Sequence, residues 1–206
     1  MECGLKGLVL AGGKSSRLGR DKVTVPVSGV SLLSRTAHLA KRFCGEVYVS
    51  GRDPGPMQVS FPWLADDVPG MGPMGGILTG LDKLGSTLLV LACDLPMLNE
   101  TTLDRLLDAH LRRPPSAVMT TFRQVETGYI ESLVAVYEPG AAPYLRQSGR
   151  SGLYKLSRAV PEAVRHHVDY SQAESSVFFN INYPADLALF QRVEAMQAAN
   201  PDRSFL

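Results

Sequence analysis

Short apolar runs alternate with longer segments in which apolar residues recur every three or four positions through the first half of the chain. Continuous apolar runs before turn residues are typical of buried parallel strands. Recurrence at three- and four-residue spacing predicts amphipathic helices. The predicted strands are 7–11, 46–50, 59–64 and 87–92, and the predicted helices are 31–43, 74–84 and 99–111. This order predicts an α/β fold, Rossmann-like, with an open, mostly parallel sheet and helices on both faces.

Side chains at the ends of these segments predict where two helices begin. Ser31 and Asn99 each carry an oxygen that can accept a hydrogen bond from the first helical turn. Gly45 can adopt the left-handed conformation that commonly ends a helix, so we expect the first helix to stop there.

The second half of the chain is less regular. Its predicted strands are 117–121, 132–137, 164–168 and 178–181, and its predicted helices are 139–147, 152–159 and a last one from Pro184. Residues 115–182 are expected to form a small irregular lobe on the sheet edge. Because no linker interrupts the sequence, we expect one domain over 1–206, with halves at 1–112 and 113–206.

Composition excludes several classes of protein. The 206 residues suffice for one domain with a core, and a net charge of +1 favours neither nucleic acid nor a membrane as partner. Three scattered cysteines are too few for a disulfide framework or a zinc site, and the four histidines show no metal or triad spacing and are expected at the surface. The first apolar run, 7–11, is too short for a signal sequence or a membrane span, so we expect a cytoplasmic protein.

The strongest chemical signal is the segment 8–22, which reads Leu-Val-Leu-Ala-Gly-Gly-Lys-Ser-Ser-Arg-Leu-Gly-Arg-Asp-Lys. Its glycines let the backbone approach a bound group closely. Four cations lie within nine residues, at Lys14, Arg17, Arg20 and Lys22. Free N–H groups with fixed positive charge suit a polyphosphate, so the segment predicts a nucleoside triphosphate site rather than a solvated surface turn. Its spacing fits neither the P-loop nor the dinucleotide fingerprint.

Asp94 follows the most apolar predicted strand, in the sequence Ala-Cys-Asp-Leu-Pro. In open α/β sheets, ligands bind at the carboxyl ends of the strands. A carboxylate there, beside a triphosphate loop, is placed to hold Mg²⁺, which proteins usually bind through one or two carboxylates and substrate phosphates. The alternative is an N-terminal cap for the following turn.

The loop 66–77 begins with Asp66 and contains closely spaced glycines and prolines before a predicted helix. Gly75 and Gly76 allow that helix to approach a ligand or the first loop. A carboxylate such as Asp66 can accept hydrogen bonds from N–H groups on the edge of a nucleobase. A plain loop with a helix cap is the alternative.

The second half offers two candidate features for another substrate. Asn180 and Asn182, two apart on the predicted strand, would share a face, where their oxygens could join a metal site or bind the substrate; turn chemistry is the alternative. Cations crowd one stretch, at Arg146, Arg150, Lys155 and Arg158. This stretch predicts either a phosphate-binding patch or a solvated helix face. If it is a solvated face, we expect the substrate near Glu131 and Tyr129.

Together these motifs resemble those of the molybdenum cofactor guanylyltransferase family, in the nucleotidyltransferase superfamily, over nearly the whole chain. The resemblance implies a nucleotide-diphospho-sugar transferase type of fold, with nucleotide binding in 1–112 and acceptor binding in 113–206. It implies Mg²⁺ held by Asp94, catalytic roles for Arg17, Lys22 and Asp94, and acceptor contacts from Asn180, Asn182 and Arg150. The implied nucleotide-binding residues are Leu10, Ala11, Gly12, Gly13, Lys22, Ser50, Asp66 and Asp94.

The resemblance implies transfer of GMP from GTP to the terminal phosphate of molybdopterin, with release of pyrophosphate. Cofactor-delivery proteins or molybdoenzymes are the implied partners. Two other functions stay open: a sister enzyme that uses CTP or a sugar phosphate, and a non-catalytic GTP-binding protein that delivers the cofactor. The chain departs from the family pattern at Ser50, where Asn is common, and at Ser132, where Pro often follows the equivalent of Glu131.

Overall fold

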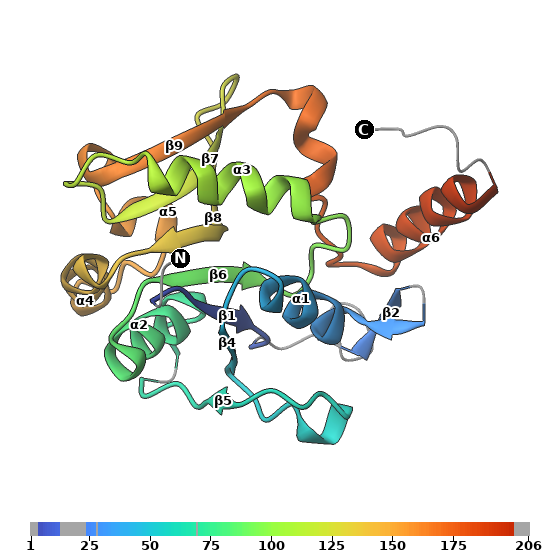
Figure 1. The fold of residues 1–206 in the computed structure, drawn as a ribbon, viewed down its shortest axis with the longest axis horizontal. Helices are drawn as coiled ribbons and strands as arrows, with labels where there is room; N and C mark the ends of the chain where they lie inside the picture. Colours follow the sequence, from blue (N-terminus) through green and yellow to red (C-terminus); the bar gives the residue numbers. More distant parts are fainter. Residues whose placement is uncertain (1–3, 13–23, 28, 69, 200–206) are drawn as a thin grey trace.

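A seven-stranded sheet forms the centre of the computed structural model, which describes residues 4–12, 24–27, 29–68 and 70–199 (Figure 1). In spatial order the strands are β5 (Trp63–Leu64), β4 (Glu46–Ser50), β1 (Lys6–Leu10), β6 (Leu88–Ala92), β8 (Ile130–Tyr137), β7 (Met119–Gln124) and β9 (Arg165–Tyr170). Only β8 pairs antiparallel, with β6 and β7, so the sheet is mostly parallel as predicted. Both halves of the chain contribute to this sheet, because the second half adds β8, β7 and β9 beyond β6.

Helices cover both faces of the sheet, because successive strand residues point to opposite sides. Helices α1 (Leu32–Lys41) and α3 (Glu100–Leu111) pack on one face, where Val9 and Leu91 lie in their apolar cluster. Helices α2 (Pro73–Leu84), α4 (Ala142–Arg150) and α5 (Leu156–Ala159) pack on the other, against Leu8 and Val90. Leu8 and Val9 in β1, like Val90 and Leu91 in β6, thus face opposite sides of the sheet. This explains why β6 is apolar throughout and why β1 is apolar after Lys6.

A smaller apolar cluster lies beyond the sheet. It joins the hairpin of β2 (Pro26–Val27) and β3 (Val30–Ser31) to the last helix, α6 (Pro184–Ala199). Short 3-10 helices complete the described elements, at η2 (Gly55–Met57), η3 (Pro139–Ala141), η4 (Glu162–Val164) and η5 (Gln172–Phe178). No helix in the described ranges combines the length and apolar character needed to cross a bilayer.

Both predicted helix starts are confirmed. Ser31 Oγ accepts a hydrogen bond from the Ser34 N–H at 3.2 Å, and Asn99 Oδ1 accepts one from the Thr102 N–H at 2.9 Å. The predicted end at Gly45 is wrong, because α1 stops at Lys41 and its cap, Arg42, keeps a right-handed conformation.

Two other predictions are corrected. The segment 178–181 is not a strand: Ser171 and Glu174 form a capping box that starts η5, and residues 179–182 carry no regular structure. His110 is not at the surface but 4% exposed, since it lies on the buried side of α3, with Nε2 3.1 Å from a Glu138 carboxylate oxygen.

Candidate functional site

The carboxyl ends of β4, β1 and β6 are level, because Leu10 pairs in register with both Ser50 and Ala92. The Ala11 N–H donates to the Ser50 carbonyl at 3.0 Å, and the Cys93 N–H donates to the Leu10 carbonyl at 3.4 Å. The residues after these strands therefore emerge at one edge, which is where ligands bind in open parallel sheets.

The first glycine of the loop lies against the end of β4. A Cβ atom on Gly51 would lie 2.9 Å from Gly12 Cα, and Gly51 has a φ of +91°, so this close approach requires glycine. Leu10 and Ala11 are buried and Gly12 is exposed. Leu10 and Ala11 can therefore offer a nucleotide mainly backbone groups. Gly13, Arg17 and Lys22 lie outside the described residues, so their roles stay predictions.

Ser50 and Asp66 form a pair at the same edge. Ser50, only 2% exposed, donates its hydroxyl to Asp66 Oδ1 at 3.1 Å. A Cβ atom on Gly76 would lie 2.2 Å from Ser50 Oγ and 3.4 Å from Asp66 Oδ1. The glycine in α2 therefore lets the helix sit against this pair, which orients one carboxylate oxygen of Asp66.

The neighbouring carboxylate, Asp67, contacts α2. The Asp67 N–H donates to Thr79 Oγ1 at 3.1 Å, and Asp67 Oδ1 lies 2.6 Å from Lys83 Nζ. Both partners belong to α2. Asp67 thus holds the loop against the helix, and of the two adjacent acids it is Asp66 that bonds to Ser50 at the sheet edge.

Asp94, half-buried, follows β6, and its carbonyl accepts a hydrogen bond from the Ile181 N–H at 3.0 Å. This bond draws the segment before α6 to the sheet edge. Asp94 and Asn180 both line a cavity of about 350 Å³. Asp94 and Asn180 therefore lie at the same cavity, and a loop rather than the predicted strand brings Asn180 there.

Further polar side chains line the same cavity. They come from β8 and from the segment before and within α5, and they are Glu131, Ser132, Lys155 and Ser157. Glu131 Oε1 accepts a hydrogen bond from the Tyr170 hydroxyl at 2.6 Å. Burial raises the pKa of Glu131 above its ordinary value, and the bond from Tyr170 partly offsets this.

The structure does not place all four cations of the predicted patch at this cavity. Arg146 forms an ion pair with Asp82 of α2, and Arg150 is exposed at the end of α4 and does not line the cavity. Of the four cations in the patch, Lys155 is the one that lines the cavity. Asn182 is also exposed and outside the lining, and its N–H donates to Asp186 Oδ2 at 2.8 Å. In the sequence, no local signal separates Lys155 from Arg146, Arg150 and Arg158.

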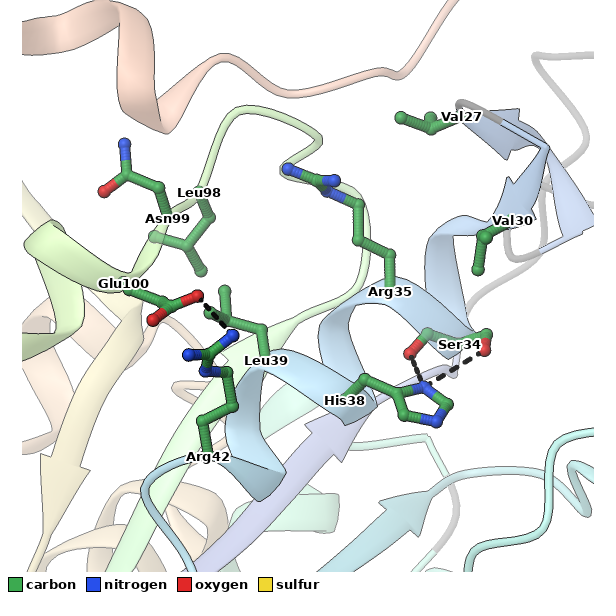
Figure 2. Close-up of a pocket in the computed structure, with 10 residues that line it drawn as sticks. All are labelled: Val27, Val30, Ser34, Arg35, His38, Leu39, Arg42, Leu98, Asn99 and Glu100. Atoms are coloured by element: carbon green, nitrogen blue, oxygen red, sulfur yellow. Dashed lines mark hydrogen bonds and ion pairs between the residues drawn. The ribbon is translucent and has the colours of Figure 1, made fainter.

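A larger cavity, of about 590 Å³, lies between α1, the β2–β3 hairpin and the start of α3 (Figure 2). Arg42 and Glu100 form an ion pair of 2.9 Å at its wall, and the His38 ring bonds to Ser34. None of the predicted site residues within the described ranges lines it. The predicted chemistry therefore gathers at the edge with Ser50, Asp66 and Asp94.

Residues 7–168 match the family described as the MobA-like NTP transferase domain. This chain belongs to that family. The molybdenum cofactor guanylyltransferase of Rhodobacter capsulatus is 40% identical over 190 residues, which cover 89% of this chain and 93% of that relative. A molybdenum cofactor biosynthesis bifunctional protein of Synechocystis is 32% identical over 88% of this chain, which spans only 52% of that longer relative.

Solved structures of other NTP transferases share the fold. Molybdopterin-guanine dinucleotide biosynthesis protein A of Archaeoglobus fulgidus superposes with a TM-score of 0.75 at 24% identity, covering 93% of this chain and 99% of that one. A CMP:2-keto-3-deoxy-manno-octonic acid synthetase solved with CTP gives 0.68 at 15% identity, covering 95% and 99%. At these identities the likeness establishes the nucleotide-diphospho-sugar transferase type of fold, as predicted.

Proposed function

We propose that this NTP transferase transfers GMP from GTP to the terminal phosphate of molybdopterin and releases pyrophosphate. The observation that carries the proposal is the meeting of Asp94 and Asn180 in one cavity at the edge where Gly12 and the Ser50–Asp66 pair also lie. Membership of the family and relatives named molybdenum cofactor guanylyltransferase support this choice of substrates. Molybdoenzymes or cofactor-delivery proteins would receive the product.

The nucleotide lies along the edge formed by β1 and β4. Asp66, oriented by Ser50, accepts hydrogen bonds from the N1–H and 2-amino groups of guanine. Backbone groups of Leu10 to Gly13 contact the phosphates, as glycine-rich loops do. Arg17 and Lys22 neutralise the phosphate charge as pyrophosphate leaves.

The site fits Mg²⁺. Asp94 supplies one half-buried carboxylate and Asn180 an amide oxygen at the same cavity. The described residues contain no cluster of three His, Cys, Asp or Glu side chains that could hold a metal by themselves. This set suits a cation that takes one or two carboxylates and completes its shell with substrate phosphates. Bound there, Mg²⁺ would neutralise charge on the α-phosphate.

The reaction needs no general base, because the acceptor phosphate is already an anion. One of its oxygens attacks the α-phosphorus, the bond to the bridging oxygen breaks, and pyrophosphate leaves with the electron pair. Positioning and charge neutralisation then supply the catalysis. An in-line attack places the acceptor opposite pyrophosphate, and the cavity shared by Asp94, Asn180 and Lys155 meets that need.

Pyrophosphate release with molybdopterin and GTP, CTP or ATP tests the proposal. We expect GTP to be favoured by about 10² or more, because a site that hydrogen-bonds a base edge rejects bases lacking those groups. Equal or better turnover with CTP would place the protein among cytidylyltransferases. Turnover with a sugar phosphate in place of molybdopterin, or GTP binding without pyrophosphate release, would also contradict the proposal.

Lys155 is expected to attract the acceptor phosphate. Lys155→Ala should raise the KM for molybdopterin about tenfold, as expected for loss of one charged hydrogen bond, and leave the KM for GTP unchanged. The wild-type KM for molybdopterin should rise with salt, and less so in the variant. Arg150→Ala, which removes an exposed cation outside the cavity, is the control and should change neither KM. The opposite pattern would place the acceptor at the end of α4.

A further inference from the structure

Glu131 is a carboxylate held in one orientation inside the acceptor cavity. It is the second residue of β8, between the buried Ile130 and Ser132. Its Oε1 accepts the Tyr170 hydroxyl bond at 2.6 Å. Tyr170 is itself 4% exposed, and its ring lies 4.7 Å from that of Phe178, centroid to centroid. The phenol is therefore fixed by packing, and it fixes the carboxylate.

The second oxygen of Glu131 is available to a ligand. Within the described ranges, no hydrogen bond reaches its Oε2 and no cation pairs with the carboxylate. Glu131 is partly buried, and removing part of a carboxylate from water without a cation or further donors is costly. A ligand that brings adjacent N–H groups into the cavity would offset this cost.

The cavity also suits a flat heterocycle. Its volume of about 350 Å³ lies in the range of small-molecule sites. Leu133, Leu156 and Phe178 supply apolar lining, and Tyr129 adds an aromatic ring. A cation, Lys155, lines the same cavity and can take a phosphate on the same ligand.

We propose, resting on the function proposed above, that Glu131 recognises the pterin ring of the acceptor through its N3–H and 2-amino groups. These groups are adjacent on a 2-amino-4-oxopyrimidine, so Oε2 and the second lone pair of Oε1 can each accept one hydrogen bond. Tyr170 acts as a positioning residue that keeps Glu131 aligned. Asn180 cannot replace Glu131 in this role, because an amide offers a single acceptor oxygen.

Binding of two free rings tests the inference without catalysis. Pterin carries the 2-amino group, whereas lumazine is the same bicycle with an oxo group there, which would face the carboxylate. Titrating each fluorescent ring with wild-type protein should show pterin bound at least about tenfold more tightly, since the carboxylate would lose a hydrogen bond and meet an acceptor. Glu131→Gln should abolish this preference, because its amide N–H₂ faces the donors of pterin.

Two more variants sharpen the test. Tyr170→Phe keeps the ring packing, removes only the hydroxyl, and should reduce the pterin preference without abolishing it. Glu162→Gln changes an exposed carboxylate in η4, outside the cavity, and should leave the preference as in wild type.

The outcomes separate this inference from the proposed function. If wild-type protein binds neither ring, both the inference and the molybdopterin acceptor are overturned. If wild type prefers pterin and the preference survives in Glu131→Gln, only the role of Glu131 is overturned. Should Glu131→Gln not fold, as judged by circular dichroism, an unchanged preference in Tyr170→Phe overturns the inference alone.

Discussion

Replacing Asp94 by Asn is expected to lower turnover with GTP and molybdopterin by about 10² or more, comparable with the loss of one main electrostatic contact in other enzymes. The carboxylate is the only one at the end of β6, and the nearly isosteric amide weakens cation binding. The fold should survive, because the hydrogen bond from Ile181 goes to the backbone carbonyl of Asp94. The rate of pyrophosphate release measures turnover, and the midpoint of thermal unfolding shows whether the variant keeps its fold.

Asp108→Asn is a matched control for this experiment, since Asp108 lies on the exposed side of α3. It makes the same chemical change away from the edge and should leave turnover unaltered. Full activity in Asp94→Asn would remove Asp94 from the mechanism. Loss of activity with a collapsed thermal midpoint would make it a structural residue.

Gly76→Ala is expected to weaken GTP binding about tenfold or more and to lower the free energy of unfolding by about 1–3 kcal/mol, as overpacking does. The added Cβ would lie 2.2 Å from Ser50 Oγ, so either α2 moves or the Ser50–Asp66 bond breaks. Both changes displace Asp66, the carboxylate that we propose to recognise guanine. Titration with GTP and denaturant unfolding measure the two effects.

Gly80→Ala separates the two effects. Gly80 lies one turn further along α2, where a Cβ would meet Leu8 and Leu88 side chains at 2.9 Å, away from the Ser50–Asp66 pair. This variant should lose stability and keep its affinity for GTP. If both variants weaken GTP binding equally, the effect of Gly76→Ala is general overpacking and Asp66 has no special role.

Local sequence signals sufficed for most of the first half. Apolar runs and side-chain caps depend on neighbours within a few residues, so β1, β4, β6, α2 and the starts of α1 and α3 could be predicted. Signals that need distant partners failed. Phe178 reads as the start of a strand, yet it packs against Tyr170 and Phe122, and the capping box before it starts a 3-10 helix.

In the candidate site, too, local sequence signals identified some residues and missed others. Its first residues could be predicted because Ser50 ends a recognisable strand, Gly12 and Asp94 closely follow two others, and the ends of parallel strands meet at one edge. Which cation lines the cavity could not be predicted. Arg150 and Lys155 look alike in sequence, and only the packing of α4 and α5 on the sheet places one outside the cavity and the other in its lining.

The sequence by itself determined the class of fold, the family and the sheet edge at which we propose that the nucleotide binds, because these depend on short motifs that act through their own backbone. The tertiary structure decided the second half of the site. The antiparallel insertion of β8 between β6 and β7 brings Glu131 to the cavity that Asp94 lines, and the bond from Ile181 to Asp94 draws Asn180 there. Strand order and loop docking depend on contacts between residues that are far apart in the sequence. Glu131 lies 37 positions after Asp94, and Ile181 lies 87 positions after it. No local pattern encodes contacts over such separations.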